Sequence, residues 1–170
     1  LTVRAYPGHI APERVKTDLP PFVKSLRENG ITVTVMASDI TDASTPHAEA
    51  MLDTASSLGI HHHWWRGLTV DRSLPYPQQL ETLKPRVAQL ARLNEKYGMK
   101  AMYHPTGTFS SGFADILDLV RNFDPRYISI QYDTGNFQQM NQQILAQHLR
   151  IGGPYIGGVA FKDFVFEKSA

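Results

Sequence analysis

The chain has 170 residues, of which 42% are hydrophobic and 19% are charged, a composition typical of globular proteins. This length suits one domain with a sizeable core, but a complete eight-stranded β/α barrel usually takes ~250 residues. Seventeen basic and sixteen acidic residues give a formal net charge of +1. Because no basic cluster is present, nucleic acid and an anionic membrane surface are both excluded as expected partners.

The sequence contains no cysteine, which excludes disulfides, thiolate metal sites and a cysteine nucleophile. It also lacks the continuous apolar run of ~20 residues that a membrane span needs. The first residues do not resemble a signal peptide, so the cytoplasm is the favoured compartment and export stays open. Association into homo-oligomers is likewise left open.

Short β-type runs alternate with helix-type segments along the chain, as in parallel strands joined by crossover helices. Strands are predicted at Leu1 to Tyr6, Ile31 to Ala37, Ile60 to Arg66, Met99 to His104, Tyr127 to Asp133 and Ile156 to Lys162. Helices are predicted from Thr45-Pro46 to Leu58 and over Gln78 to Tyr97, Phe113 to Phe123 and Gln138 to Arg150. No linker interrupts this pattern, so we expect one domain over residues 1–170.

The two faces of the strands differ, because alternate residues of a strand point to opposite sides of a sheet. The second strand opposes Ile31, Val33 and Val35 to Thr32, Thr34, Met36 and Ser38, and the fifth opposes Ile128, Ile130 and Tyr132 to Ser129, Gln131 and Asp133. One face suits covering helices, and the other is small or polar and becomes more polar toward the carboxyl end. This pattern favours an α/β barrel with a site at its mouth over a doubly wound sheet, which needs two apolar faces.

A polar group stands at or just past the carboxyl end of each predicted strand. These groups are Arg4 and His9, Ser38 and Asp39, Arg66, His104, Asp133 with Asn136, and Lys162 with Asp163. Sites of parallel β/α proteins are built at that edge, so we expect these side chains to form one constellation.

Each of the main candidates has a functional and a structural interpretation. His104 could ligate a metal or move a proton, or simply bond to loop backbone. If Asp133 is buried, its carboxylate needs a cation or hydrogen-bond donors beside it. The structural interpretation is that Asp133 caps the next helix. Lys162 points inward by parity and needs an anionic partner, and Arg66 is a planar donor for a phosphate or carboxylate. Either cation could instead pair with Asp133 as a structural salt bridge.

The run His61-His62-His63 suggests a metal site, but only His61 and His63 share a face of the predicted strand. They precede the bulky Trp64-Trp65 in mid-strand, so packing is the favoured interpretation.

Several short motifs occur in a characteristic order and spacing. They are Leu1 to Arg4 with Gly8-His9, Ile40-Thr41-Asp42 before Pro46-His47-Ala48-Glu49, Leu58-Gly59-Ile60 leading to Arg66-Gly67, His104 to Thr108, Asp133-Thr134-Gly135, and Val159 to Phe164. Together they resemble the xylose-isomerase-like barrel superfamily, which contains sugar-phosphate isomerases and epimerases. The resemblance implies a (β/α)8 TIM barrel of which this chain holds strands two to seven, as a fragment of a longer chain.

The resemblance also implies a divalent metal (manganese, magnesium, cobalt or zinc) held by carboxylate and histidine ligands. The implied metal ligands are Asp133 and His104, the implied catalytic residues are Asp133, His104 and Lys162, and the implied substrate-binding residues are Arg66, Arg4, His9 and Asn136. However, Asn136 and Ala160 stand where family members commonly have histidines. We therefore expect a metal only in the full-length protein, and no tight binding to this chain.

Two functions are then in competition. The first is an isomerase, epimerase or related lyase of carbohydrate metabolism that abstracts a proton beside the carbonyl of a sugar, sugar phosphate or cyclitol. The second is a non-catalytic relative with a degraded metal site that binds a sugar or a partner. Endonuclease chemistry on DNA, which the superfamily also includes, needs a basic face that this nearly neutral chain lacks.

Overall fold

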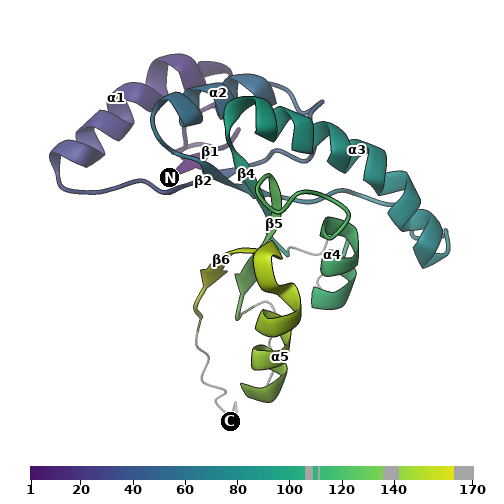
Figure 1. Ribbon diagram of the computed structural model, residues 1–170. Coiled ribbons are helices and arrows are strands. Elements are labelled where there is room, and N and C mark those ends of the chain that lie inside the picture. The colour runs from purple at the N-terminus through teal and green to yellow at the C-terminus, as the bar shows by residue number, and fades with distance from the viewer. Residues whose placement is uncertain (106–108, 111, 136–141, 163–170) are drawn as a thin grey trace, which may run out of the picture.

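The computed structural model describes residues 1–105, 109–110, 112–135 and 142–162. Within these residues six parallel strands form one sheet, in the order β1-β2-β3-β4-β5-β6 (Figure 1). The strands are β1 (Thr2–Val3), β2 (Val35–Ser38), β3 (His62–Trp65), β4 (Lys100–Tyr103), β5 (Ile128–Asp133) and β6 (Ile156–Ala160). Each strand pairs with the next one along the chain, and β1 and β6 are the two edges. The predicted α/β class is confirmed, and the open sheet agrees with an incomplete barrel.

The helices connect the strands as crossovers on one side of the sheet. They are η1 (Pro12–Arg14), α1 (Val15–Glu28), α2 (Ala48–Ser57), α3 (Tyr76–Tyr97), α4 (Phe113–Val120), α5 (Gln142–Gly152) and η2 (Gly153–Tyr155). In Figure 1, α1, α2 and α3 lie along the top of the sheet, and α4 and α5 continue beside β5 and β6. None of the helices in the described ranges combines the length and the apolar character needed to cross a bilayer.

The core lies between the sheet and these helices, and alternate strand residues reach into it. Ile128, Ile130 and Tyr132 of β5 are fully buried in this core, as the alternation predicts. In β2 the prediction is wrong, because Met36 packs in the core while Val35 lines a hollow on the other face. The strand begins only at Val35, so the alternation over residues 31–34 belongs to irregular chain and does not define a strand face.

A histidine is buried completely on the helix side of β3. The Nε2–H of His63 donates to Oδ1 of Asn94 on α3 at 3.0 Å, and Nδ2 of Asn94 donates to the Tyr127 carbonyl at 3.1 Å. Burial lowers the pKa of His63 to about 4, although the bond to Asn94 opposes this shift. His63 is therefore a neutral packing residue, whereas His62 points to the opposite face and lines a hollow there.

Candidate functional site

Asp133, the last residue of β5, lies where three predicted site residues meet. Its side chain is only 1% exposed. Its Oδ1 accepts the N–H of Gly135 at 2.9 Å. Its Oδ2 lies 2.7 Å from Nζ of Lys162 and 3.4 Å from Nε2 of His104. Neither contact is aligned as a hydrogen bond, so Oδ2 remains a buried acceptor that can take one more donor.

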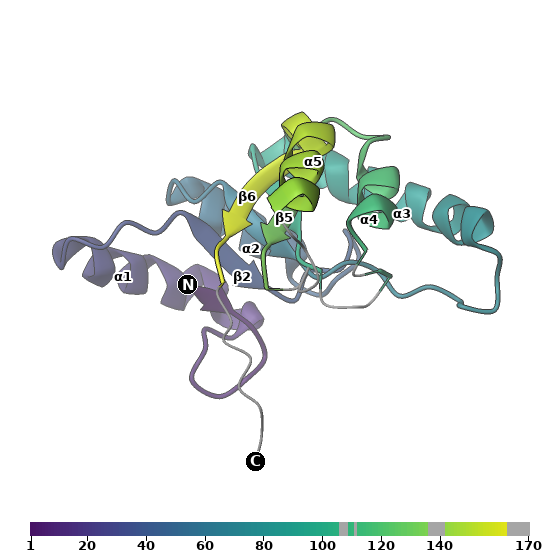
Figure 2. The same cartoon turned by 90° about the horizontal axis from the view of Figure 1, so that it is seen from below.

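The backbone brings Lys162 to this carboxylate. Asp133 is in register with Ala160 of β6, whose carbonyl accepts the N–H of Thr134 at 3.0 Å. The hydroxyl of Thr134 accepts the N–H of Lys162 at 2.7 Å and donates to the Lys162 carbonyl at 2.9 Å. Thr134 therefore fixes the chain just beyond β6, and Figure 2 shows the arrowheads of β5 and β6 pointing the same way.

His104 follows β4, and its N–H donates to the Trp65 carbonyl at 2.9 Å. Its ring stacks on Trp64, with centroids 4.5 Å apart and planes inclined by 12°. Burial lowers the pKa of His104, Asp133 opposes this shift, and Lys162 and Arg4 add to it. The imidazole is therefore neutral near pH 7, and a neutral imidazole can accept a proton.

The carboxyl group of Asp133 keeps its charge despite its burial. Burial by itself raises the pKa of Asp133, but the Lys162 ammonium, the Gly135 N–H and the nearby His104 together hold the pKa below its ordinary value. The site thus places a carboxylate, an ammonium and a neutral imidazole around one buried oxygen atom.

A second charged cluster stands at the same edge of the sheet. Nη1 of Arg66 lies 2.8 Å and Nε of Arg4 lies 3.2 Å from Oδ1 of Asp39. One carboxylate is thus shared by two guanidinium groups. Ser38 is a structural residue instead, since its hydroxyl donates to the Trp64 carbonyl at 3.2 Å.

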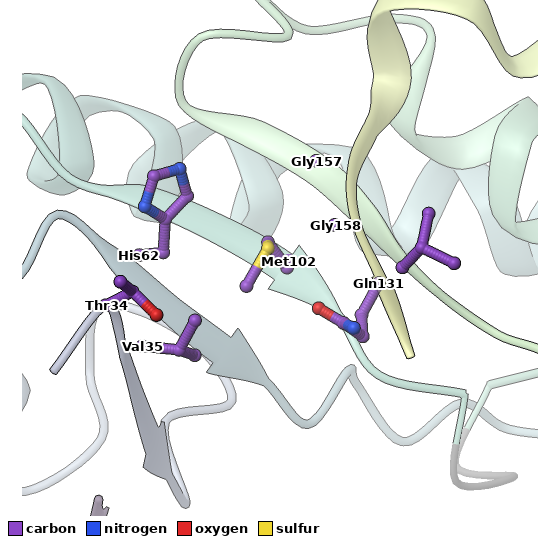
Figure 3. Close-up of a pocket in the computed structure, with 8 residues that line it drawn as sticks. Thr34, Val35, His62, Met102, Gln131, Gly157 and Gly158 are labelled. Carbon is purple, nitrogen blue, oxygen red and sulfur yellow. The ribbon is translucent and has the colours of Figure 1, made fainter. Parts of the chain in front are cut away.

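Two hollows occupy the face of the sheet away from the helices. One, of about 340 Å³, lies beside the site and is lined by Leu1, Thr2, Arg4, Val35, Ala37, Trp64 and Gln131. The other, of about 240 Å³, lies between β2 and β6 and is shown in Figure 3. Gly158 and Met102 meet closely there, because a Cβ on Gly158 would lie 3.0 Å from Sδ of Met102. Glycine at this position lets β6 approach the centre of the curved sheet.

The structure thus brings Asp133, His104 and Lys162 into contact and joins Arg4 to Arg66 through Asp39. His9 is different, because it is exposed in the turn after β1. The predicted residues Asn136 and Asp163 lie outside the described residues.

Sequence reasoning missed two residues of this region, Trp64 and Gln131. Trp64 was not predicted to belong to the site, but it lines the larger hollow and its ring stacks on that of His104. The signal that could have found it is parity, since Trp64 alternates with the buried His63 and Trp65 and so must face the other side.

Among the described residues, the donor atoms at Asp133 do not complete a site for a divalent metal ion. In the part of the chain that the structure describes, no group of three histidine, cysteine or acidic residues could hold one. Asp133 and His104 offer two ligands, whereas protein sites for such ions generally use three or more. The third side chain at this point is the cation Lys162.

Several solved structures share this fold at low sequence identity. The 3-keto-D-glucoside 4-epimerase YcjR from E. coli has a TM-score of 0.67 and 14% identity, with 87% of this chain and 65% of that chain covered. A D-tagatose 3-epimerase-like protein has a TM-score of 0.67 and 16% identity, with 93% and 65% covered. The IOLI protein, solved with a binding zinc atom, has a TM-score of 0.61 and 15% identity, with 91% and 59% covered.

This chain spans less than two thirds of the length of these three structures. No curated protein matches it closely enough to count as a relative. The family described as "xylose isomerase-like TIM barrel" matches residues 6–170, which is nearly the whole sequence. The resemblance suggested by the sequence motifs is thereby confirmed, and the chain belongs to the xylose isomerase-like TIM barrel family.

Proposed function

We propose that this chain carries the reaction centre of a sugar isomerase or epimerase, which moves a proton next to a carbonyl group. The observation that carries the proposal is the meeting of His104 and Lys162 at one buried oxygen of Asp133. Membership of the family and the epimerase names of two structural neighbours support the same class of reaction. A sugar, a sugar phosphate or a cyclitol would be the substrate.

The three groups match the needs of this reaction. When the C–H bond beside the carbonyl breaks, its electron pair forms the C=C bond of an enediolate, and the proton passes to a base. The base comes from the pair of His104 and Asp133, a neutral imidazole beside a carboxylate. The ammonium of Lys162 stabilises the negative charge that develops on the substrate oxygen. Return of the proton to the other face, or to the neighbouring carbon, gives the epimer or the isomer.

The surroundings of the site suit a polyhydroxylated substrate. Trp64 offers an apolar ring on the wall of the larger hollow, on which the C–H face of a sugar can pack. The guanidinium groups of Arg4 and Arg66 offer donors at the same edge, for hydroxyl oxygens or for an anionic group of the substrate.

Deuterium exchange tests this proposal without knowledge of the product. The protein is incubated in heavy water with a panel of aldoses, ketoses, their phosphates and keto-cyclitols, and NMR follows the C–H signal beside the carbonyl. We expect at least one substrate to exchange, and Asp133→Asn to slow the exchange about 10²- to 10⁴-fold. The surface variant Lys96→Gln, which removes an exposed ion pair with Glu49, is the matched control and should exchange normally.

The same experiment separates the alternative function. A sugar that changes the fluorescence of Trp64 but never exchanges its proton, in wild type as in Asp133→Asn, would overturn the catalytic proposal. It would instead support a sugar-binding relative, which the alanine at position 160 favours because a histidine ligand is common there in the family.

A further inference from the structure

We infer that the Lys162 ammonium is the built-in cation of this site and stands in place of a divalent metal ion. This inference deepens the proposed function and rests on it for the catalytic role, but the identity of the cation can be tested without any sugar. It is carried by the 2.7 Å contact between Nζ of Lys162 and the buried Oδ2 of Asp133.

A buried carboxylate needs a compensating charge, and only a near one is effective. The two arginines at this edge, Arg4 and Arg66, already contact Asp39. His104 lies farther away, at 3.4 Å, and is neutral near pH 7. Among the described residues, Lys162 is therefore the cation that compensates Asp133.

The position of this lysine is fixed by its own backbone. Both the N–H and the carbonyl of Lys162 are bonded to the hydroxyl of Thr134, the residue that follows Asp133. The backbone of Lys162 is thus held beside Asp133, which keeps the carboxylate within reach of its side chain.

A metal ion on Oδ2 of Asp133 would compete directly with this ammonium. Oxygen ligands hold such ions at about 2.0–2.6 Å, so the ion would stand within about 5 Å of Nζ, which is itself 2.7 Å from Oδ2. Repulsion between the two cations adds to the shortage of ligands, since Asp133 and His104 supply only two. The lysine therefore does more than replace a ligand, because it opposes binding of the ion.

The ammonium can supply the electrostatic part of the reaction. The side chain of Lys162 is 48% exposed, so N–H donors of its ammonium can reach a substrate at the mouth of the site. Donors aimed at a developing enediolate oxygen stabilise it in the way that a metal ion does in related chemistry.

Metal titration of variants tests this assignment. Manganese, zinc and cobalt chlorides are titrated calorimetrically into the wild-type chain, into Lys162→Glu and into the control Lys96→Glu. Lys162→Glu replaces the cation with a third ligand beside Asp133 and His104, whereas Lys96→Glu places a new carboxylate beside Glu49 without a histidine. We expect wild type and the control to bind no tighter than millimolar, and Lys162→Glu to bind at least about 100-fold tighter. Adding Asp133→Asn should abolish that gain.

A second measurement covers the case in which the glutamate variant folds poorly. In Lys162→Gln, which removes only the charge, carboxyl carbon NMR should show the pKa of Asp133 rising above its wild-type value. Micromolar zinc binding by wild type that is lost in Asp133→Asn would overturn the inference, and so would an unchanged pKa of Asp133 in Lys162→Gln. Proton exchange that requires added manganese would refute the assignment of Lys162 as the cation of the site, but it would leave the proposed function intact.

Discussion

The two faces of the sheet each hold a histidine with a polar partner, and the two pairs differ in the hydrogen-bonding atoms that they leave without a partner. On the helix side, Nε2 of His63 bonds to Asn94, whose amide in turn bonds to Tyr127. On the open side, His104 stands beside Asp133, whose Oδ2 has no aligned donor.

This difference separates structure from function more clearly than residue type does. A closed polar pair ties β3 to α3 and offers nothing to a ligand. A pair with a charged, under-satisfied oxygen beside a hollow is arranged to meet a further molecule.

The largest effect should come from Asp133→Asn. Proton exchange beside a substrate carbonyl should fall about 10²- to 10⁴-fold, while the melting temperature changes little, because the amide can keep the Gly135 contact. His63→Gln alters the pair on the helix side instead, so we expect a lower melting temperature but normal exchange per folded molecule. Deuterium exchange and calorimetry on both variants check this. Equal losses of exchange in both would break the comparison.

The second prediction concerns pH and the closed pair. His63 stays neutral in the folded chain down to a pKa of about 4 but takes up a proton near pH 6.5 when unfolded. Between these values the unfolded chain binds more protons, so the unfolding free energy should fall as pH drops from about 6.5 to about 4. The loss is on the order of 3 kcal/mol, and below pH 4 this group contributes no more.

Urea denaturation at a series of pH values measures this slope. The double variant His63→Leu with Asn94→Leu removes both polar partners and should flatten much of it. A shallower slope of the same sign should remain, since burial also lowers the pKa of His104. A double variant with an undiminished slope would show that His63 is not the titrating group.

The third prediction addresses Asn94 alone. Asn94→Ala leaves Nε2 of His63 without its partner in a dry environment and removes one of two donors to the Tyr127 carbonyl, which keeps the N–H of Ala101. This change should cost about 2 kcal/mol of unfolding free energy. Exchange activity per folded molecule should be unaffected. Thermal denaturation measures the change, and a variant as stable as wild type would mean that water replaces the amide.

The smallest effect should come from Lys96→Gln, which breaks the exposed contact with Glu49. An ion pair in full contact with solvent contributes little, so neither the melting temperature nor the exchange rate should move measurably. The same chemical change at Lys162 should slow exchange strongly. If the two variants had the same exchange rate, the burial of Asp133 would not matter to catalysis.

Much of the fold could be predicted from the sequence, because apolar runs and helix ends mark the elements locally. The strand over Ile128–Asp133 and the helix ending before Gly98 both follow the expected pattern. Helix α1 was not identified, since Pro20 and Pro21 lie inside it and prolines normally interrupt helices. Its buried face of Val15, Leu19 and Val23 shows that tertiary packing outweighs the missing hydrogen bonds.

The site was predictable wherever strand parity controls a side chain. Asp133 and Lys162 point inward because each continues the alternation of its strand, and Thr134 holds the two chains in that register. His9 was placed at the site by its position after a strand, but a turn residue has no parity to orient it. The sharing of Asp39 by Arg4 and Arg66 depends on three separate strands, so only the tertiary structure reveals it.

The route by which Lys162 reaches the site links the activity to one edge of the described sheet. The residue follows β6, an edge strand whose neighbour Phe161 is 85% exposed. Edge strands open at lower free energy than central ones, and each opening would withdraw the ammonium from Asp133. Catalysis should then fade at urea concentrations that leave the helical circular dichroism intact, so that an enzyme assay would report the fraying of one strand.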